Sequence, residues 1–403
     1  MIAGRHSDPA LRLLIEADPD DVDLDDADQD DKRLDVPGVR IHAGKALLIL
    51  AGEGALAAAY APRFAEVHCH NAYHPQHAAA LTTTRSAGLA NVRCVLGDLP
   101  CAERTGNSQN PPDKEGEGET LLSPIRYPEG TFDAIAFRLG QGTALLNAVL
   151  AESFRLLKPG GALMVAGHNQ EGIKSFAKRA EAHFGNQSMA GLKSGCRLLR
   201  YRKESKHPVD PVAAPRYFHP VRLELEIPGS RRIEYLTKPG IFAYRATDPG
   251  TALLAKHLPD CAGKSVLDLG CGSGALSLAA FALGADSVLA SDSSAIAIAC
   301  TAANFTAQDR AGNTHCGDLG QGLEGGFDLV LCNPPFHKDG ETDYGLPERI
   351  LNAIWKQLRP GGEAYLVANQ FLDYSTLAQR VFGEASILVR DPGYLIHRMV
   401  KAA

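Results

Sequence analysis

The stretch Val266-Leu267-Asp268-Leu269-Gly270-Cys271-Gly272-Ser273-Gly274 decides the fold of this chain. Its first four residues form a short, largely apolar run of the kind that builds a buried parallel strand. Three glycines follow at alternate positions, and an apolar helical pattern begins near Ala275. Glycine lets the backbone bend tightly and approach a ligand without a side chain between them. The stretch therefore predicts a strand, a ligand-binding turn and a helix.

The chain carries this pattern twice. Four pairs of segments match in the same order along the sequence. The pairs are 45–56 with 264–276, 97–98 with 317–318, 132–133 with 327–328, and 157–161 with 358–362. Matches that keep one order indicate two copies of one domain. Because each copy alternates apolar strands with helical periods, we predict an α/β fold, with a parallel sheet covered by helices on both faces in each domain.

A proline-rich stretch from Ser205 to Pro215 separates the two copies. We predict an acidic, disordered segment over 1–36, a first domain over 37–205, a linker leading into the second copy over 206–238, and a second domain over 239–403. A polar stretch from Arg104 to Gly130 is expected to be a surface insertion in the first domain.

Charge and composition exclude several classes of protein. Of the 403 residues, the first 36 hold 4 Lys/Arg against 12 Asp/Glu, which leaves 37 against 35 for the rest, so the body is nearly neutral. The chain has no apolar run long enough to span a membrane, and Asp8 and Pro9 interrupt its start where a secretory signal would be apolar. The nine cysteines form no Cys-x-x-Cys pair, which argues against a disulfide framework or a cysteine zinc site. We expect a cytoplasmic protein without a bound metal.

The acid just before the glycine turn indicates the kind of cofactor. A dinucleotide site has the order G-x-G-x-x-G, with phosphates over the helix N-terminus. Here the order is D-x-G-x-G-x-G, and Asp268 is poorly suited to sit beside phosphates. A carboxylate at this place suits the amino acid end of a cationic cofactor without phosphates, and S-adenosylmethionine has that chemistry. We therefore expect Asp268, Gly270, Cys271, Gly272 and Gly274 to bind S-adenosylmethionine.

Two further acids follow the next strands. Asp292 ends the run from Ser287 and can accept both hydroxyls of a ribose, although Asp292 as the N-cap of the next helix is the alternative. Asp318 is placed to bind the adenine amino group, although an aspartate in Gly-Asp-Leu-Gly is also common turn chemistry.

Asn333-Pro334-Pro335-Phe336 follows the strand Phe327–Cys332 directly. Ligands of open α/β sheets bind beyond the carboxyl ends of strands, so this tetrapeptide is expected to face the glycine turn. The prolines stiffen the backbone, which makes the Asn333 side-chain oxygen and the Pro334 carbonyl a rigid pair of acceptors, and Phe336 offers a face for stacking. Two acceptors that hold both N–H groups of a nucleobase amine direct its lone pair at a methyl sulfonium and stabilise the developing positive charge. No strong base is required.

These residues carry a resemblance to a known family. With the glycine turn, four segments look like the bacterial guanine-N2 methyltransferases of small-subunit (16S) ribosomal RNA that have tandem methyltransferase domains; they are 239–242, 248–254, 333–337 and 367–372. The resemblance implies two Rossmann-like class I methyltransferase domains, of which the N-terminal one is degenerate, has lost the cofactor and helps to hold RNA. It implies that Phe242 lines the cofactor and that Asn333, Pro334 and Phe336 hold the guanine. Ala243 departs from the serine that relatives often have there.

The first copy lacks the residues that this chemistry needs. Its counterpart of Asp268 falls at Ile49 and Leu50, Asn71 replaces Asp292, and 137–142 stands where the Asn-Pro-Pro-Phe motif should be. We therefore predict that this copy neither binds the cofactor nor catalyses. A metal site at His68-Cys69-His70 with His74 and His77 is a weaker alternative, because no second cysteine completes it.

The sequence thus predicts a monomeric enzyme that transfers a methyl group from S-adenosylmethionine to the exocyclic N2 of a guanine in ribosomal RNA, with that RNA or the small ribosomal subunit as its partner. The same site on adenine N6 or a protein glutamine is an alternative, as is an RNA-binding ribosome-assembly factor.

Overall fold

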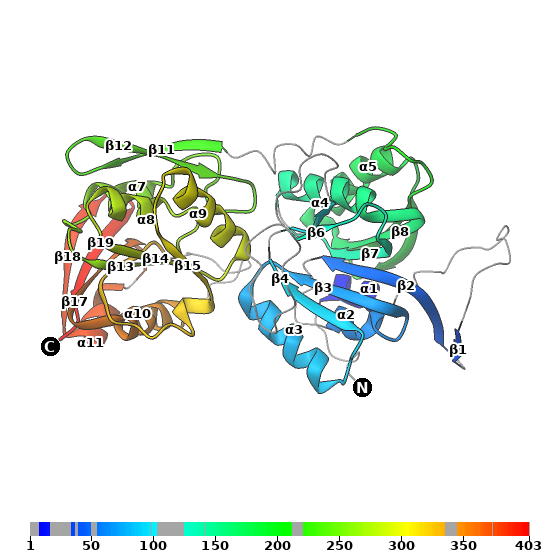
Figure 1. The fold of residues 1–403 in the computed structure, drawn as a ribbon, viewed down its shortest axis with the longest axis horizontal. Helices are drawn as coiled ribbons and strands as arrows, with labels where there is room; N and C mark the ends of the chain where they lie inside the picture. Colours follow the sequence, from blue (N-terminus) through cyan, green and yellow to red (C-terminus); the bar gives the residue numbers. More distant parts are fainter. Residues whose placement is uncertain are drawn as a thin grey trace. The chain divides into compact units, whose positions relative to one another are not determined.

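The structure, a computed structural model, describes residues 8–16, 34–36, 39–49, 55–97, 99–102, 125–140, 142–211, 221–334, 345–372 and 374–402. The acidic run from Asp18 to Asp31 and most of the predicted insertion lie outside these residues. Two units follow each other along the chain, Met1–Tyr217 and Phe218–Ala403. Each is an α/β domain with helices on both faces of its sheet (Figure 1), so the predicted fold class is confirmed.

The second unit contains a seven-stranded sheet in the order β15-β14-β13-β16-β17-β19-β18. Its elements are β11 (Val221–Ile227), β12 (Arg231–Thr237), α7 (Pro249–Lys256), β13 (Ser265–Leu269), α8 (Ala275–Ala282), β14 (Ser287–Asp292), α9 (Ala295–Ala307), β15 (Asn313–Cys316), η2 (Asp318–Gly320), β16 (Phe327–Cys332), α10 (Leu346–Gln357), β17 (Leu358–Asn369), α11 (Tyr374–Phe382), β18 (Glu384–Asp391) and β19 (Tyr394–Val400). The five strands from β15 to β17 are parallel, whereas β19 pairs antiparallel with both β17 and β18. The sheet is therefore mixed, and the prediction of a wholly parallel sheet is wrong at this edge, because a short turn joins β18 to β19.

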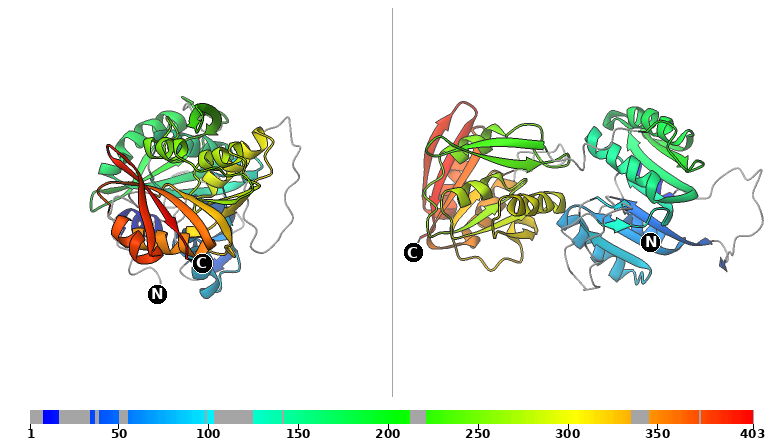
Figure 2. Two further views of the ribbon diagram at one scale, coloured as in Figure 1. Left: turned by 90° about the vertical axis from the view of Figure 1, so that its left-hand side faces the viewer. Right: turned by 45° about the horizontal axis from the view of Figure 1, so that its top comes forward.

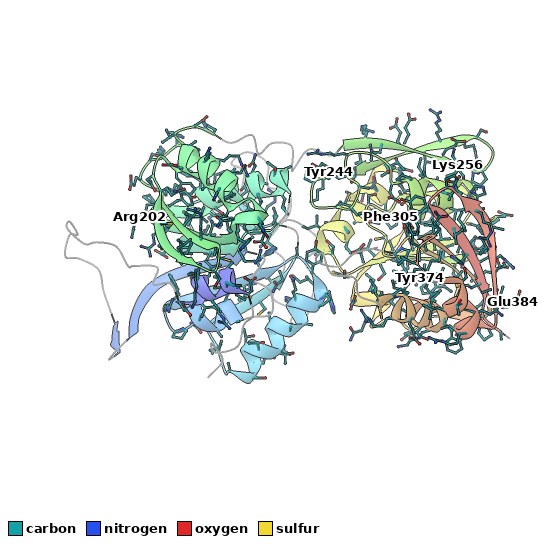
Figure 3. The ribbon with its side chains drawn as sticks, turned by 180° about the vertical axis from the view of Figure 1, so that it is seen from behind. Arg202, Tyr244, Lys256, Phe305, Tyr374 and Glu384 are labelled. Carbon is teal, nitrogen blue, oxygen red and sulfur yellow. The ribbon has the colours of Figure 1, made fainter. Side chains whose placement is uncertain are left out.

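The helices of the second unit form two layers. Figures 1 and 2 show α8 and α9 on one side of the sheet, beneath the β11–β12 hairpin, and α10 and α11 on the other. Phe305 of α9 packs edge-on against Phe281, with 5.6 Å between ring centroids, and Tyr374 at the start of α11 is buried (Figure 3). Because β14, β13 and β16 are parallel neighbours in the sheet, their carboxyl ends lie at one edge.

The first unit has an equivalent strand order, β4-β3-β2-β7-β8-β10-β9, with β1 paired to β2. Its elements are α1 (Pro9–Glu16), β1 (Leu34–Val36), β2 (Val39–Ile49), α2 (Ala55–Tyr60), β3 (Phe64–Asn71), α3 (His74–Ser86), β4 (Val92–Leu96), β5 (Cys101–Ala102), β6 (Arg126–Tyr127), β7 (Phe132–Arg138), α4 (Thr143–Leu156), β8 (Leu157–His168), η1 (Asn169–Glu171), α5 (Ile173–Phe184), β9 (Ser188–Lys193) and β10 (Cys196–Arg202). β10 again runs antiparallel to its neighbours β8 and β9. The two units therefore share one topology, as the repeated segments predict.

Helix α1 corrects the predicted disordered segment. Ala10 and Leu14 of this helix are fully buried and belong to the hydrophobic core of the first unit. Asp8 begins the helix by accepting the backbone N–H groups of Ala10 (2.8 Å) and Leu11 (3.3 Å). The prediction of disorder is therefore wrong for residues 9–16, because the acidic run that follows conceals a short amphipathic pattern.

One acid–base contact recurs at the amino ends of the central strands. In the first unit, Asp133 accepts the backbone N–H of Lys45 (2.7 Å) and pairs with Lys158 (2.8 Å). In the second unit, Asp328 accepts the backbone N–H of Ser265 (2.8 Å) and pairs with Arg359. Both acids join a neighbouring strand to the cation before a Pro-Gly-Gly turn, so this part of the sheet is built alike in both units.

Every helix within the described ranges is too short or too polar to cross a bilayer.

Candidate active site

Three adjacent strand ends in the second unit carry the predicted site residues. The parallel register sets Asp268 of β13 beside Ala290 of β14 and Leu331 of β16. Asp292 ends β14, and Asn333 follows the last residue of β16. The sheet therefore brings together, at one edge, the glycine turn, Asp292 and the Asn333-Pro334 segment.

The glycine turn uses backbone conformations that favour glycine. Gly270, Gly272 and Gly274 have φ angles of 80°, 56° and 77°. A Cβ atom on Gly274 would lie 2.7 Å from Cγ2 of Thr301, so this glycine also lets the turn pack closely on α9. A Cβ atom on Gly270 would meet nothing within 4 Å, which leaves open space beside the turn. The turn thus packs closely on α9 at Gly274 and leaves space for a ligand beside Gly270.

Asp268 is a buried carboxylate that faces the start of α8. Only 1% of the residue is exposed, and its Oδ2 accepts the backbone N–H (2.9 Å) and the hydroxyl (2.6 Å) of Ser277. Burial raises the pKa of Asp268 to about 6, although the bonds from Ser277 oppose this shift. Among the described residues no cation pairs with this acid, and a buried acid of this kind is suited to bind a ligand that brings the positive charge.

Asp292 is tied to the glycine turn by its own side chain. Its Oδ2 accepts the backbone N–H of Gly272 (3.0 Å), and its Oδ1 accepts that of Ser294 (2.8 Å). Burial raises the pKa of Asp292, and these backbone bonds oppose the shift. The alternative role as a helix cap is wrong, because Ser294 is the N-cap of α9 and accepts from Ala297. Each Asp292 oxygen keeps a lone pair, which suits the two hydroxyls of a ribose.

The other predicted cofactor residues lie around this edge in different ways. Cys271 is buried, its Sγ lies 3.5 Å from the Thr301 hydroxyl, and burial raises the pKa of its thiol. Asp318 is partly exposed and begins η2 after β15. Phe242 is 68% exposed, in a loop whose buried Ile241 approaches the Cα side of Gly272. Ala243 in the same loop has a φ of 55°, a strained value for an alanine.

The amide of Asn333 is held by the start of α7. Its Nδ2 donates to Oδ2 of Asp248 (2.8 Å) and to Oγ1 of Thr251 (2.8 Å). Its Oδ1 is buried and has no hydrogen-bond partner among the residues that the structure describes. Pro334 follows it and is buried, whereas Pro335 and Phe336 lie outside the described residues. Asn333 thus offers an unused acceptor at the edge where the cofactor residues meet.

Asp248 and Thr251 were not predicted as site residues. A signal for them exists in the repeat, because Asp8-Pro9 with Leu13-Leu14 has the same spacing as Asp248-Pro249 with Leu253-Leu254. Both acids are helix N-caps, and α1 packs on β8 and α2 as α7 packs on β17 and α8. The repeated unit therefore begins one helix earlier than the four matched segments indicate.

Register identifies the counterparts in the first unit. Leu48 pairs with Cys69 and Ala136 as Asp268 pairs with Ala290 and Leu331, so the counterpart of Asp268 is Leu48, one residue before the predicted Ile49. Asn71 ends β3 where Asp292 ends β14. Arg138 stands six residues after Phe132, as Asn333 stands six after Phe327. Leu48 has no polar group, Asn71 has an amide in place of the Asp292 carboxylate, and Arg138 has a guanidinium in place of the Asn333 amide.

The histidines of the first unit serve its packing. His68 contacts Glu66 through Nε2 (2.7 Å) and the Tyr127 hydroxyl through Nδ1 (2.9 Å). His70 is buried and contacts the carbonyl of Gly97, and burial lowers the pKa of His77 to about 4. Among the described residues no three His, Cys, Asp or Glu side chains converge as metal ligands do.

Comparisons with known proteins give the family. The model of the methyltransferase small domain matches residues 232–398, which contain the whole candidate site. The chain is 34% identical over 257 residues to the ribosomal RNA small subunit methyltransferase C of Chromohalobacter salexigens, covering 61% of this chain and 71% of that one. It is 32% identical over 278 residues to the protein of the same name from Pseudomonas entomophila, covering 69% and 82%.

A solved structure agrees with the fold of both units. The T. Thermophilus 16S rRNA N2 G1207 methyltransferase, solved in complex with AdoMet and guanosine, aligns with a TM-score of 0.70 and 24% identity over 92% of this chain and 97% of that one. At this identity the likeness concerns the fold. With the sequence matches over most of the relatives' length, the chain belongs to the ribosomal RNA small subunit methyltransferase C family.

Proposed function

We propose that the second unit transfers the methyl group of S-adenosylmethionine to the exocyclic N2 of a guanine in 16S ribosomal RNA. The observation that carries this proposal is the Asn333 amide, whose nitrogen is fully engaged and whose buried oxygen is left as an acceptor beside the glycine turn. Membership of the methyltransferase C family and the guanosine-bound relative support guanine in small-subunit RNA as the target.

The cofactor residues fit S-adenosylmethionine. Buried Asp268 would accept the ammonium group of the methionine end, and open space beside Gly270 leaves room for it. Asp292 would accept the ribose hydroxyls, Asp318 the adenine amino group, and Phe242 and Cys271 would line the site. The bound cofactor supplies a methyl group on a sulfonium centre.

The protein's own contribution is to orient the amine. A guanine N2 amine has its lone pair delocalised into the ring, so it is a weak nucleophile. Asn333 Oδ1 and the Pro334 carbonyl would each accept one N–H group, which turns the lone pair toward the methyl carbon. As the nitrogen–carbon bond forms, the carbon–sulfur bond of the sulfonium would break and leave a neutral thioether. The two acceptors would stabilise the positive charge on nitrogen until it releases one proton to water. Phe336 would stack on the base. Because the amine must leave a helix to reach this edge, the target base has to be displaced from its stack.

The first unit is proposed to have a structural and RNA-holding role without binding the cofactor. Apolar Leu48 stands at the position of Asp268, and Arg138, the counterpart of Asn333, is paired with Asp8 and Glu171. We therefore expect isothermal titration to give one S-adenosylmethionine per monomeric chain. Arg202, labelled in Figure 3, donates to the Gly160 carbonyl (3.1 Å), and the neighbouring Lys203 donates to the Leu157 carbonyl (2.8 Å), so these two cations hold the fold of the first unit.

The test is transfer of labelled methyl from S-adenosylmethionine to separated ribosomal RNAs and subunits, followed by nucleoside analysis. The proposal requires N2-methylguanosine in 16S RNA; label in adenine N6, in a protein glutamine, or in no acceptor would contradict it. Asn333→Ala should lose most turnover while the cofactor Kd stays within about twofold, because the amide acts on the amine. Asn313→Ala, an exposed amide at the start of β15, serves as the control with unchanged turnover.

A further inference from the structure

The orientation of the Asn333 amide is fixed from outside the Asn-Pro segment. The amide nitrogen has two hydrogens, and it has two acceptors at 2.8 Å, Oδ2 of Asp248 and Oγ1 of Thr251. A carboxylate only accepts hydrogen bonds, so the atom that faces Asp248 must be the nitrogen. Both hydrogens are thereby used, and the carbonyl oxygen is the group left for a ligand.

The Asp248 carboxylate is itself held firmly. Oδ2 of Asp248 also accepts the backbone N–H of Thr251 (2.8 Å), which makes Asp248 the N-cap of α7. Gly250 lets the Tyr394 ring approach this carboxylate, because a Cβ atom there would lie 3.1 Å from both Asp248 Oδ2 and Tyr394 Cε1. The acid therefore has little freedom to turn away from the amide.

The counterparts of Asp248 and Thr251 in the first unit differ in what they keep: the acid is present and the hydroxyl is absent. Asp8 caps α1 and its Oδ2 accepts from Nε of Arg138 (2.7 Å), so the acid is present in both units, whatever residue follows the strand. The counterpart of Thr251, three residues after the acid, is Leu11, which has no hydroxyl. The second unit thus has the Thr251 hydroxyl together with the Asn333 amide. The first unit has neither, because Leu11 and Arg138 stand at these positions.

We propose that Thr251 and Asp248 are positioning residues that keep the Asn333 carbonyl oxygen directed at the substrate amine. This inference rests on the proposed function, because it names how the same site prepares its acceptor. An amide has nearly the same shape after a half-turn about its last bond, so sterics alone do not choose its orientation. A turned amide presents N–H groups to an amine whose own N–H groups need acceptors, and the lone pair loses its direction.

The sharpest test changes Thr251, because Asp248 also caps a helix. Thr251→Val keeps the shape and removes the acceptor, whereas Thr251→Ser keeps the hydroxyl. In the full-length enzyme with 16S RNA, we expect kcat of Thr251→Val to fall about tenfold to a hundredfold, as when a side chain loses an outer partner that orients it. The cofactor Kd and the KM for RNA should stay within about twofold, and Thr251→Ser should stay within about threefold of wild type in kcat.

A second measurement needs no turnover and separates the two proposals. The side-chain N–H resonances of Asn333, identified by their loss in Asn333→Ala, should exchange with solvent at least about tenfold faster in Thr251→Val than in wild type. Unchanged kcat in Thr251→Val, an equal loss in Thr251→Ser, or unchanged exchange would overturn the positioning role. If wild type methylates no ribosomal RNA, the proposed function fails, and the exchange rates still decide whether Thr251 and Asp248 hold the amide.

Discussion

The substitution Asp268→Asn should raise the free energy of unfolding of the cofactor-free protein. The Asp268 carboxyl is buried, and burial raises its pKa to about 6, whereas an aspartate in the unfolded chain titrates near ~3.9. A pKa that is higher in the folded state means that folding favours the protonated form. Ionising this carboxyl at neutral pH therefore costs folding free energy, and an uncharged amide of the same shape removes that cost.

The size of the effect follows from the difference between the two pKa values. At about 1.4 kcal/mol for each pH unit, the interval from ~3.9 to about 6 corresponds to roughly 3 kcal/mol. Below pH ~4 both states are protonated and the cost is absent. It grows as the pH rises to about 6 and stays constant above. Asp268→Asn should thus gain up to about 3 kcal/mol at pH 7.5 and much less at pH 4.5.

The assay is urea unfolding of the full chain without cofactor at both pH values, followed by hydrogen exchange of peptides from β13 so that the second unit is seen separately. Asp328→Asn is the matched control, because hydrogen bonds from Ser265 and the pair with Arg359 lower the pKa of Asp328 to about 2. That carboxylate stabilises the fold above pH ~4, so its loss should destabilise at both pH values. No gain for Asp268→Asn at pH 7.5, or an equal gain at pH 4.5, would refute the reasoning.

The same substitution should weaken S-adenosylmethionine binding on the order of a hundredfold, since a charge-assisted bond to the ammonium group is lost. Calorimetry on the same protein samples measures this. A variant that gains stability and loses affinity identifies Asp268 as an acid kept for its ligand, whereas a loss of both would indicate a purely structural carboxyl.

Three further outcomes are expected. Asp292→Ala should raise the cofactor Kd about tenfold to a hundredfold in calorimetry, because bonds to two ribose hydroxyls disappear; an unchanged Kd would contradict the ribose role. Gly274→Ala should lower the free energy of unfolding in urea by about 2 kcal/mol or more, because its φ is 77° and its Cβ would lie 2.7 Å from Thr301. Gly263→Ala is the control: its φ is 71° but its Cβ meets open space, so it should cost about 1 kcal/mol. Leu14→Ala should destabilise the first unit by about 2–5 kcal/mol while the cofactor Kd stays constant; a cost below about 1 kcal/mol would show that α1 is not part of its core.

The fold was predictable from the sequence because its signals are local. The run 266–269 and the glycines after it specify a strand and a turn through backbone geometry, and the repeated segments supply the second copy. The antiparallel edge was not predictable in the same way, since β18 and β19 alternate like any strand and only their short turn, Pro392-Gly393, sets their direction. Helix α1 was missed because the eight residues it needs adjoin an acidic run that dominates the composition.

The site was predictable where one side chain follows one strand. Asp268, Asp292 and Asn333 each lie at the end of a strand, so the topology alone brings them to one edge. The hold on Asn333 was not predictable, because Asp248 and Thr251 are more than 80 residues away in sequence and meet it only through the packing of α7. A pairing of this kind has no local signal, although the spacing that Asp8-Pro9 and Asp248-Pro249 share in the repeat marks the helix start that carries it.

Asp133 and Asp328 make the same hydrogen-bond and ion-pair arrangement in the two copies, next to the cations before the Pro-Gly-Gly turns. Comparing the two copies therefore shows which contacts the fold itself uses. Each copy keeps this device at the amino ends of its strands, while Leu48 and Arg138 have replaced the polar groups at the opposite ends in the first copy. Residues that hold the sheet together and residues that serve the proposed methyl transfer thus lie at opposite ends of one architecture. The substitutions Leu48→Asp, Asn71→Asp and Arg138→Asn therefore leave this arrangement intact, which makes the first copy a scaffold on which the two cofactor-binding acids and the amine-holding amide can be rebuilt stepwise.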